Sequence, residues 1–283
     1  MTQRNPAPKG HPVIPSAARN LALIPSFTNQ CGIPRCARND SDGPSIVVLA
    51  SLLAAILACN LPSLGQEPPG NPGRLNVDDE GVFEIFLAGR RVGSESFKIH
   101  TSSGKVEARA EVTLHVERNG KTVEVQSFPE LVLDPQLHPL TYAWNQKGSQ
   151  SSRLAVDFRG RIAKVRYTTI NGNEDNREFE LPSDVVILDD NVVHHFQLLA
   201  ALYQAMGGGK QTFHVFVPQE ALPSLLAVED LGDSTGTPAG VNAHLRHLRI
   251  TTDVTQIDLW VDDQQHIERV SVPSAQLEAI RKR

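Results

Sequence analysis

Residues 106–125 read VEARAEVTLHVERNGKTVEV, and this stretch decides the fold class. Over residues 106–117 apolar and polar residues alternate one by one, which is the period of a β-strand with one buried face. Asn119-Gly120 follows the strand. This pair favours a two-residue hairpin turn, because both residues tolerate a positive φ. The stretch therefore predicts an antiparallel hairpin.

A two-residue loop fixes which residues of the two strands face each other. It places Val116 opposite Val123 and Leu114 opposite Val125, so these four side chains share one face of the hairpin. The turn chemistry and the hydrophobic pattern predict the same register. Similar units recur and predict a meander of consecutive strands. They cover 83–87 with 92–100, 154–158 with 163–167, 257–261 with 270–272, and the further strands 212–217 and 243–252.

One segment of the body carries a helical pattern instead. Asp190–Met206 is apolar over most of its circumference, and three glycines end it at residues 207–209. We expect Asp189 or Asp190 to cap its first turn. A helix with so narrow a polar stripe is buried on several sides, which a flat sheet does not provide. The sequence therefore predicts a mainly β (α+β) fold, in which a curved antiparallel meander sheet or half-barrel wraps around one buried helix.

The N-terminal part does not read as part of this fold. Residues 44–65 contain an apolar run and a small-residue cleavage signature, which are typical of a signal peptide. Residues 1–43 contain two similar repeats and are interpreted as a leader, either mistranslated or disordered. A division of the body near Asp184 is the less favoured alternative to a single domain. The expected parts are a linker over 66–80, a single β-rich domain over 81–275 and a tail over 276–283.

All three cysteines, Cys31, Cys36 and Cys59, precede residue 66, so the β-rich body holds no disulfide and no cysteine nucleophile. Two routes of processing stay open. Cys59 is lipidated if the preceding residues act as a lipoprotein signal, and it is removed if a signal peptidase cuts after it. Both routes predict export to the periplasm or outer envelope of a bacterium. We expect membrane attachment only through a lipid on Cys59.

The charge of the chain bears on its partners. The formal net charge is −5, and residues 66–283 hold 22 Lys and Arg against 30 Asp and Glu. Domains that bind nucleic acids usually carry a basic surplus. We therefore expect no nucleic-acid partner.

A short motif after the first predicted strand suggests a family. Gly89-x-x-Val92-Gly93-x-Glu95-x-Phe97 resembles the opening hairpin of bacterial envelope proteins classed as domains of unknown function 3108 or 6134. The resemblance covers most of residues 80–275, and it implies a curved antiparallel sheet around a helix, similar to periplasmic lipoprotein carriers. It transfers no catalytic residue. Gly89 and Gly93 are interpreted as structural, because glycine permits tight turns and close backbone approach.

Histidines offer the clearest candidates for a metal site. On a helix, Asp190 and His194 stand one turn apart and converge on one side, but the adjacent His195 points about 100° away. The alternative interpretation is a capping aspartate followed by histidines at the margin of the helix. His244 and His247 lie three apart in a predicted strand and face opposite sides. We favour no metal site at either place.

No catalytic constellation is visible in the body. The sequence has no Gly-x-Ser-x-Gly elbow, and residues 207–210 (GGGK) lack the spacing of a phosphate-binding loop. We therefore expect no catalytic residue and no cofactor, while an exported hydrolase remains the least favoured function.

Aromatic residues are the candidates for ligand binding: Phe97, Phe196, Tyr203 and Trp260. Most of them also suit a core, whereas Trp260 stands on a strand face that is otherwise polar. The leading hypothesis is an exported non-enzymatic envelope protein that binds a lipid, another apolar small molecule or an envelope component. The alternative is a structural or protein-interaction module of the cell envelope, which binds an envelope protein through a sheet face or edge.

Overall fold

The computed structural model describes residues 75, 77–118, 120–147, 151–234 and 244–283. They form a fifteen-stranded sheet, one α-helix and two short 3-10 helices. The strands are β1 (Asp79–Leu87), β2 (Arg90–Ser102), β3 (Lys105–Arg118), β4 (Lys121–Leu133), β5 (Pro139–Lys147), β6 (Ser152–Arg159), β7 (Ile162–Thr168), β8 (Glu174–Glu180), β9 (Val186–Ile187), β10 (Gln211–Val217), β11 (Leu222–Ser234), β12 (Leu245–Thr251), β13 (Gln256–Val261), β14 (Ile267–Val272) and β15 (Leu277–Arg281). The helices are α1 (His195–Ala205), η1 (Pro218–Glu220) and η2 (Pro273–Ala275).

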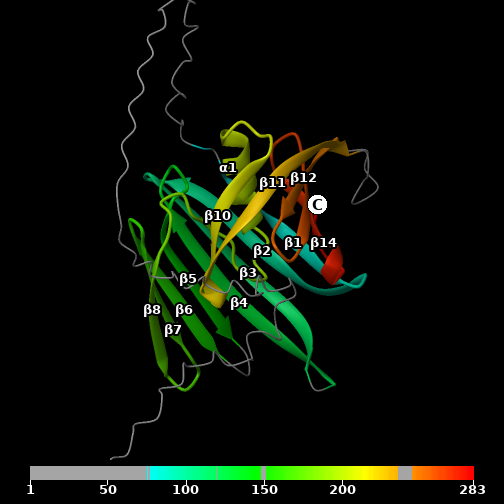
Figure 1. Ribbon diagram of the computed structural model, residues 1–283. Helices are drawn as coiled ribbons and strands as arrows, with labels where there is room; N and C mark the ends of the chain where they lie inside the picture. The colour runs from blue at the N-terminus through cyan, green and yellow to red at the C-terminus, as the bar shows by residue number, and fades with distance from the viewer. Residues whose placement is uncertain (1–74, 76, 119, 148–150, 235–243) are drawn as a thin grey trace, which may run out of the picture.

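The sheet is a meander that returns to its own starting strand. Its order is β8-β7-β6-β5-β4-β3-β2-β1-β15-β14-β13-β12-β11-β10-β9, and every pair is antiparallel except β9 with β10. The sheet curves strongly, and α1 lies within the curve near one end of the molecule (Figure 1). The predicted fold class, a curved meander sheet around one buried helix, is therefore confirmed.

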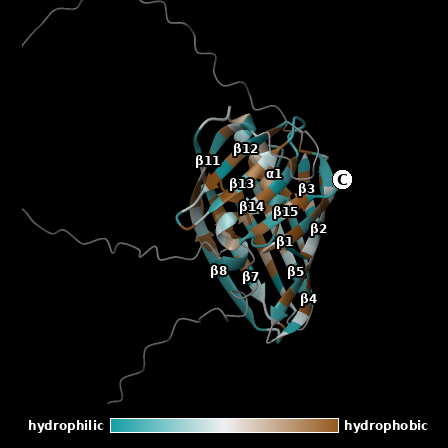
Figure 2. Ribbon diagram, turned by 90° about the vertical axis from the view of Figure 1, so that its right-hand side faces the viewer, coloured by the Kyte–Doolittle hydropathy of each residue, from teal (hydrophilic) through white to brown (hydrophobic). Residues whose placement is uncertain are grey.

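Alternation along the strands supplies the core. Bands of apolar and polar residues follow one another along the strands (Figure 2), and the apolar set forms one buried cluster on the inner face of the sheet. The register predicted for the first hairpin is confirmed, since Val116 pairs with Val123 and Leu114 with Val125. Asn119 of its turn lies outside the described residues.

The predicted C-terminal tail is wrong. Leu277–Arg281 is β15, which fills the central position of the sheet between β14 and β1. Leu277 and Ala279 alternate with half-buried residues and are buried in the core, a pattern too short to stand out in the sequence. The predicted linker also ends too late, because β1 begins at Asp79, whose buried carboxylate pairs with Arg281.

The helix begins later than predicted and is capped differently. α1 starts at His195. It cannot extend back to Asp190, because Asn191 has a φ of 61°, which a right-handed helix does not allow. Neither Asp189 nor Asp190 caps α1: the residue at the N-cap position is His194, and its side chain makes no capping hydrogen bond.

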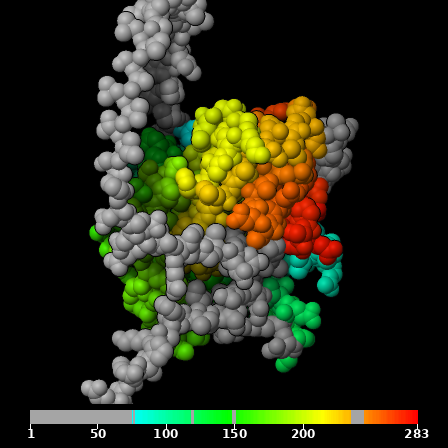
Figure 3. Space-filling view, in the orientation of Figure 1, coloured from blue at the N-terminus to red at the C-terminus, as the bar shows by residue number. Residues whose placement is uncertain are grey.

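The two halves of the sheet differ in length. β3 and β4 hold 14 and 13 residues, whereas β13 and β14 hold six each. The later strands, yellow to red in the space-filling view, occupy the upper part of one face, and atoms of the earlier strands, in green, extend below them (Figure 3). Within the described part of the chain, no helix has the length and hydropathy needed to cross a bilayer.

Candidate functional site

Buried polar side chains surround the first turn of α1. Glu95, on β2, has no exposed surface. Its carboxylate lies on the buried face of the strand, together with Gly93 and Phe97. Its carboxylate accepts hydrogen bonds from the backbone N–H groups of Val193 and His194, both at 2.7 Å. Nδ1 of His194 lies 2.9 Å from the same carboxylate. A helix N-terminus offers unpaired N–H groups and partial positive charge, so Glu95 anchors α1 to the sheet.

Asp189 joins two further elements. Its carboxylate accepts a hydrogen bond from the hydroxyl of Tyr142 on β5. It also accepts one from the backbone N–H and one from the side-chain amide of Gln219 in η1, each at 3.0 Å. The same amide donates to the backbone carbonyl of Asp190 at 3.0 Å. In the sheet order, β5 lies on one side of β1, whereas η1 connects β10 and β11 on the other side. Asp189 therefore links the two halves of the sheet.

Burial sets the protonation of this cluster. It raises the pKa of Asp189 to about 6, while the hydrogen bonds from Tyr142 and Gln219 act in the opposite direction. Burial, followed by the neighbouring carboxyl groups of Asp189 and Glu220, raises the pKa of Asp190 well above its usual range. Burial also lowers the pKa of His195, as does His194 beside it. The site therefore disfavours charge on Asp190 and on His195.

The two buried histidines pack against aromatic rings. His194 stacks on Phe97 with ring centroids 5.8 Å apart, and His195 meets Tyr142 edge-on at the same separation. The metal ligand pair considered from the sequence does not form on one helical turn, because Asp190 precedes α1. In the described ranges, no three or more His, Cys, Asp or Glu side chains are arranged to hold a metal ion.

The other histidine pair is also separated. His244 precedes β12, is exposed, and lies 3.1 Å from Asp233 and 3.5 Å from Asp263. His247 lies within β12, 2.9 Å from Asp258. Each histidine therefore pairs with different carboxylates.

The four aromatic ligand candidates do not meet in one place. Phe97, Phe196 and Tyr203 are at most 4% exposed and belong to the core. Trp260 lies on the outer face of β13, where its ring stacks on His247 at 4.8 Å and on the guanidinium of Arg269 at 4.6 Å. Three of the candidates are therefore packing residues in this conformation, and the fourth faces the other side of the sheet.

The two glycines of the opening motif lie where the backbone leaves no alternative. Gly89 has a φ of 74° in the turn between β1 and β2. A Cβ on Gly93 would stand 2.1 Å from the backbone oxygen of Thr113 on the paired strand. Gly89 therefore serves the turn of the β1–β2 hairpin, and Gly93 permits the close pairing of β2 with β3. Cys59, the possible lipidation site, lies outside the described residues.

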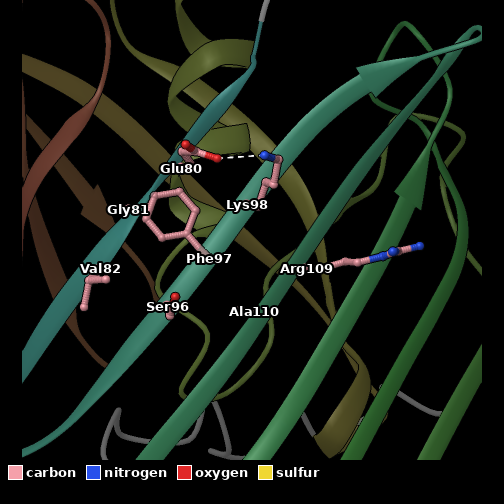
Figure 4. A pocket seen from close by; sticks show the side chains of 8 residues that line it. All are labelled: Glu80, Gly81, Val82, Ser96, Phe97, Lys98, Arg109 and Ala110. Atoms are coloured by element: carbon pink, nitrogen blue, oxygen red, sulfur yellow. Dashed lines mark hydrogen bonds and ion pairs between the residues drawn. The ribbon is translucent and has the colours of Figure 1, made fainter.

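An open hollow of about 630 Å³ lies over β1, β2 and β3. Lys98 pairs with Glu80 across two strands there at 2.7 Å, and Arg109 points away from the other lining side chains (Figure 4). Arg109 instead pairs with Glu107 and Glu130. Both cations already have exposed carboxylate partners, so the hollow offers no unpaired charge to a ligand.

A different part of the inner face is less covered. Val112 stands opposite Glu95, and therefore beside the start of α1. Val116 and its partner Val123 lie four residues farther along β3, about 13 Å away at the rise of a β-strand. Val116, Val123 and Val125 are half-buried, whereas Val112 is 1% exposed. We call the region of these three valines the hairpin end, and that of α1 with residues 188–194 the helix end.

Sequence reasoning missed the roles of Glu95, Tyr142 and Gln219. A signal for Glu95 was present, because it alternates with Gly93 and Phe97 and so places a carboxylate on the buried face of β2. Nothing local marked Tyr142 or Gln219 as partners of Asp189. The cluster has the groups of acid–base chemistry, yet Glu95, His194 and His195 have no exposed surface. In this conformation its contacts support the fold.

No family model matches the chain, and no curated protein sequence does. Two solved structures are similar in shape. One is a β-barrel-like protein of domain of unknown function 1849 from Brucella abortus, with a TM-score of 0.48 and 9% identity, covering 72% of this chain and 95% of the other. The second is a protein of the domain of unknown function 1089 family from Pseudomonas aeruginosa, with a TM-score of 0.40 and 14% identity, covering 62% of this chain and 87% of the other.

Proposed function

We propose that the protein is an exported, non-enzymatic module that binds the apolar part of a small molecule, such as an acyl chain, at the hairpin end of its sheet. The observation that carries this proposal is the uneven cover of one apolar sheet face. The helix end is filled by α1 and its polar anchors, whereas the valines of the hairpin end are only half-buried.

The apolar face of β4 continues across β5 to β7 at the level of Pro129, which is opposite the buried Trp144. Trp144 on β5 and Tyr167 on β7 point to the same face as the core residue Leu154 between them. Burial of apolar surface contributes about 25 cal/mol per Å², so roughly 300 Å² of ligand surface contributes about 7 kcal/mol before the costs of association. An acyl chain lying along these residues has the chemistry that such a wall recognises.

The envelope setting of the proposal comes from the sequence. The signal-like segment 44–65 and Cys59 favour export, and the resemblance of the opening hairpin to envelope proteins points the same way. The pairing of a curved sheet with an internal helix is compatible with this reading. It also retains the expectation that any membrane attachment runs through a lipid on Cys59.

The test is to purify the mature protein from its native envelope, extract it with organic solvent, and analyse extract and protein by mass spectrometry. We expect a stoichiometric apolar molecule in the extract. Val125→Lys places a charge on the inner wall and removes that molecule, whereas Glu124→Lys changes the exposed neighbouring position and retains it. A clean extract from the unmodified protein contradicts the proposal.

An interaction module is the second candidate, and one edge of the sheet favours it. β8 is a terminal strand that pairs only with β7 among the described residues. Its exposed Glu174, Glu178 and Glu180 oppose pairing between two copies, because like charges would face each other. A strand from another envelope protein is the partner that this edge would accept. Cross-linking from β8 to such a protein, together with a clean extract, would favour this function over the first.

A further inference from the structure

One charged pair faces inward on an otherwise uncharged wall. The register places Arg177 of β8 opposite Val165 and Asp175 opposite Tyr167, both on β7. Paired residues of neighbouring strands share one face of a sheet, so both charges lie on the inner face with the buried Val165. On β5, β6, β7 and β8, whose residues the structure describes throughout, no other inward position carries a charged residue.

Arg177 stands where the packed core gives way to solvent. Phe179, two residues farther along β8, packs against the core and meets Phe216 of β10 with ring centroids 5.3 Å apart. In the other direction the side chain of Arg177 is 32% exposed and that of Asp175 is 43% exposed. The guanidinium therefore lies at the boundary of the apolar wall, on the terminal strand of the sheet (Figure 1).

Asp175 occupies only part of this guanidinium. Its Oδ2 atom accepts from Nε at 2.9 Å and from Nη2 at 2.6 Å, whereas Nη1 has no partner among the described residues. A guanidinium carries five N–H donors. Arg109 of the same molecule holds two carboxylates, those of Glu107 and Glu130, each at 3.0 Å. Arg177 holds one, and its remaining donors are able to bind a second.

We propose that Arg177 binds the head of the ligand, and that the ligand is a long-chain carboxylate such as a fatty acid. This inference rests on the proposed function and names the class of molecule that the apolar wall receives. The open edge of the guanidinium presents two N–H groups side by side, which match the two oxygens of a carboxylate.

The surroundings of Arg177 suit the apolar part of such a ligand. Tyr167, its diagonal neighbour on β7, is half-buried and offers a ring beside the head. From there the chain extends across β7 and β6 towards Trp144 on β5, which lies three strand spacings or about 14 Å from β8. Head and chain therefore meet different parts of one continuous face.

The measurement is quenching of tryptophan fluorescence in the full chain by two probes, a fatty acid brominated in its chain and the methyl ester of the same acid. The ratio of the two dissociation constants, ester over acid, reports on the carboxylate because the chains are identical. Arg177→Gln removes the guanidinium, and we expect this ratio to fall about tenfold through weaker binding of the acid. The affinity for the ester should stay unchanged.

Arg166→Gln is the matched control. Arg166 is exposed on the outer face of β7, next to Tyr167 in the chain, so its loss changes the net charge equally and should leave the ratio unchanged. Saturable binding of both probes with an unaltered ratio in Arg177→Gln overturns this inference and leaves the proposed function standing. An equal fall in both variants assigns the effect to net charge and also overturns it. If neither probe binds saturably, the proposed function fails as well.

A second variant serves as the test should Arg177→Gln fail to fold. Asp175→Asn removes the carboxylate that competes for the guanidinium, so the ratio of ester to acid dissociation constants should rise. Inward-pointing charges on a terminal strand also oppose the addition of further strands. A ratio that stays the same or falls in Asp175→Asn would leave the pair with that role alone and would contradict carboxylate binding.

Discussion

The helix end and the hairpin end lie on the same face of one sheet, but they are covered by different means. At the helix end, Glu95 receives two backbone N–H groups at 2.7 Å, and Asp189 receives three hydrogen bonds from β5 and η1. At the hairpin end, half-buried valines continue the apolar face with no such partners. Polar contacts fix the helix at one end, and under the proposed function the less covered apolar surface at the other end receives the ligand.

The largest expected effect comes from breaking the helix anchor. Glu95→Gln keeps the shape of the side chain but replaces one carboxylate oxygen with an NH₂ group, which cannot accept from Val193. Removing one partner of a buried charged contact costs about 3–5 kcal/mol, so we expect a fall of this size in the free energy of unfolding. Urea unfolding at pH 7 measures it. Glu107→Gln, at an exposed ion pair with Arg109, should change stability by less than about 1 kcal/mol.

A smaller loss is expected at the second anchor. Tyr142→Phe removes the hydroxyl that donates to Asp189 and leaves the carboxylate with the two donors of Gln219. Hydrogen bonds to charged groups contribute about 1.5–3 kcal/mol, and the unfolding free energy should drop by that amount. Tyr167→Phe, at a half-buried tyrosine on β7, provides the matched control. An equal loss in both variants would mean that the hydroxyl of Tyr142 has no special role.

The smallest effects compare the two ends directly. Val112→Ala removes two methyl groups at a 1% exposed position beside the helix, and we expect a loss of about 2 kcal/mol. Val125→Ala removes the same atoms at the half-buried hairpin end, where the loss should stay below about 1 kcal/mol. Chemical denaturation of the pair tests the contrast. If Val125→Ala costs as much as Val112→Ala, the hairpin end is packed like the core.

Local sequence patterns predicted the hairpins and the curved meander, but not the interactions between distant segments. The register of β3 with β4 followed from alternation and an Asn-Gly turn, which act within twenty residues. β15 was missed because five residues carry too little pattern, and its place depends on pairing with β1 at the other end of the chain.

The start of α1 shows the same limit. The sequence favoured an aspartate as cap, yet Glu95 supplies the carboxylate from 98 residues away. Alternation along β2 is the signal that could have placed Glu95 on the buried face, but it cannot identify its partner, since that depends on the curvature of the whole sheet. The hairpin end was equally hidden: alternation shows that its valines face inward, but not that they are only half-buried there.

The chain has two tryptophans, and they allow the central claim to be tested directly. Trp144 lies on the inner face of β5, two residues beyond Tyr142 towards the hairpin end, whereas Trp260 lies on the outer face of β13. The measurement is quenching of tryptophan fluorescence by a brominated fatty acid. We predict saturable quenching in the unmodified protein and in Trp260→Phe, and none in Trp144→Phe. Quenching that persists in Trp144→Phe, or no quenching at all, would contradict a ligand site on the inner face.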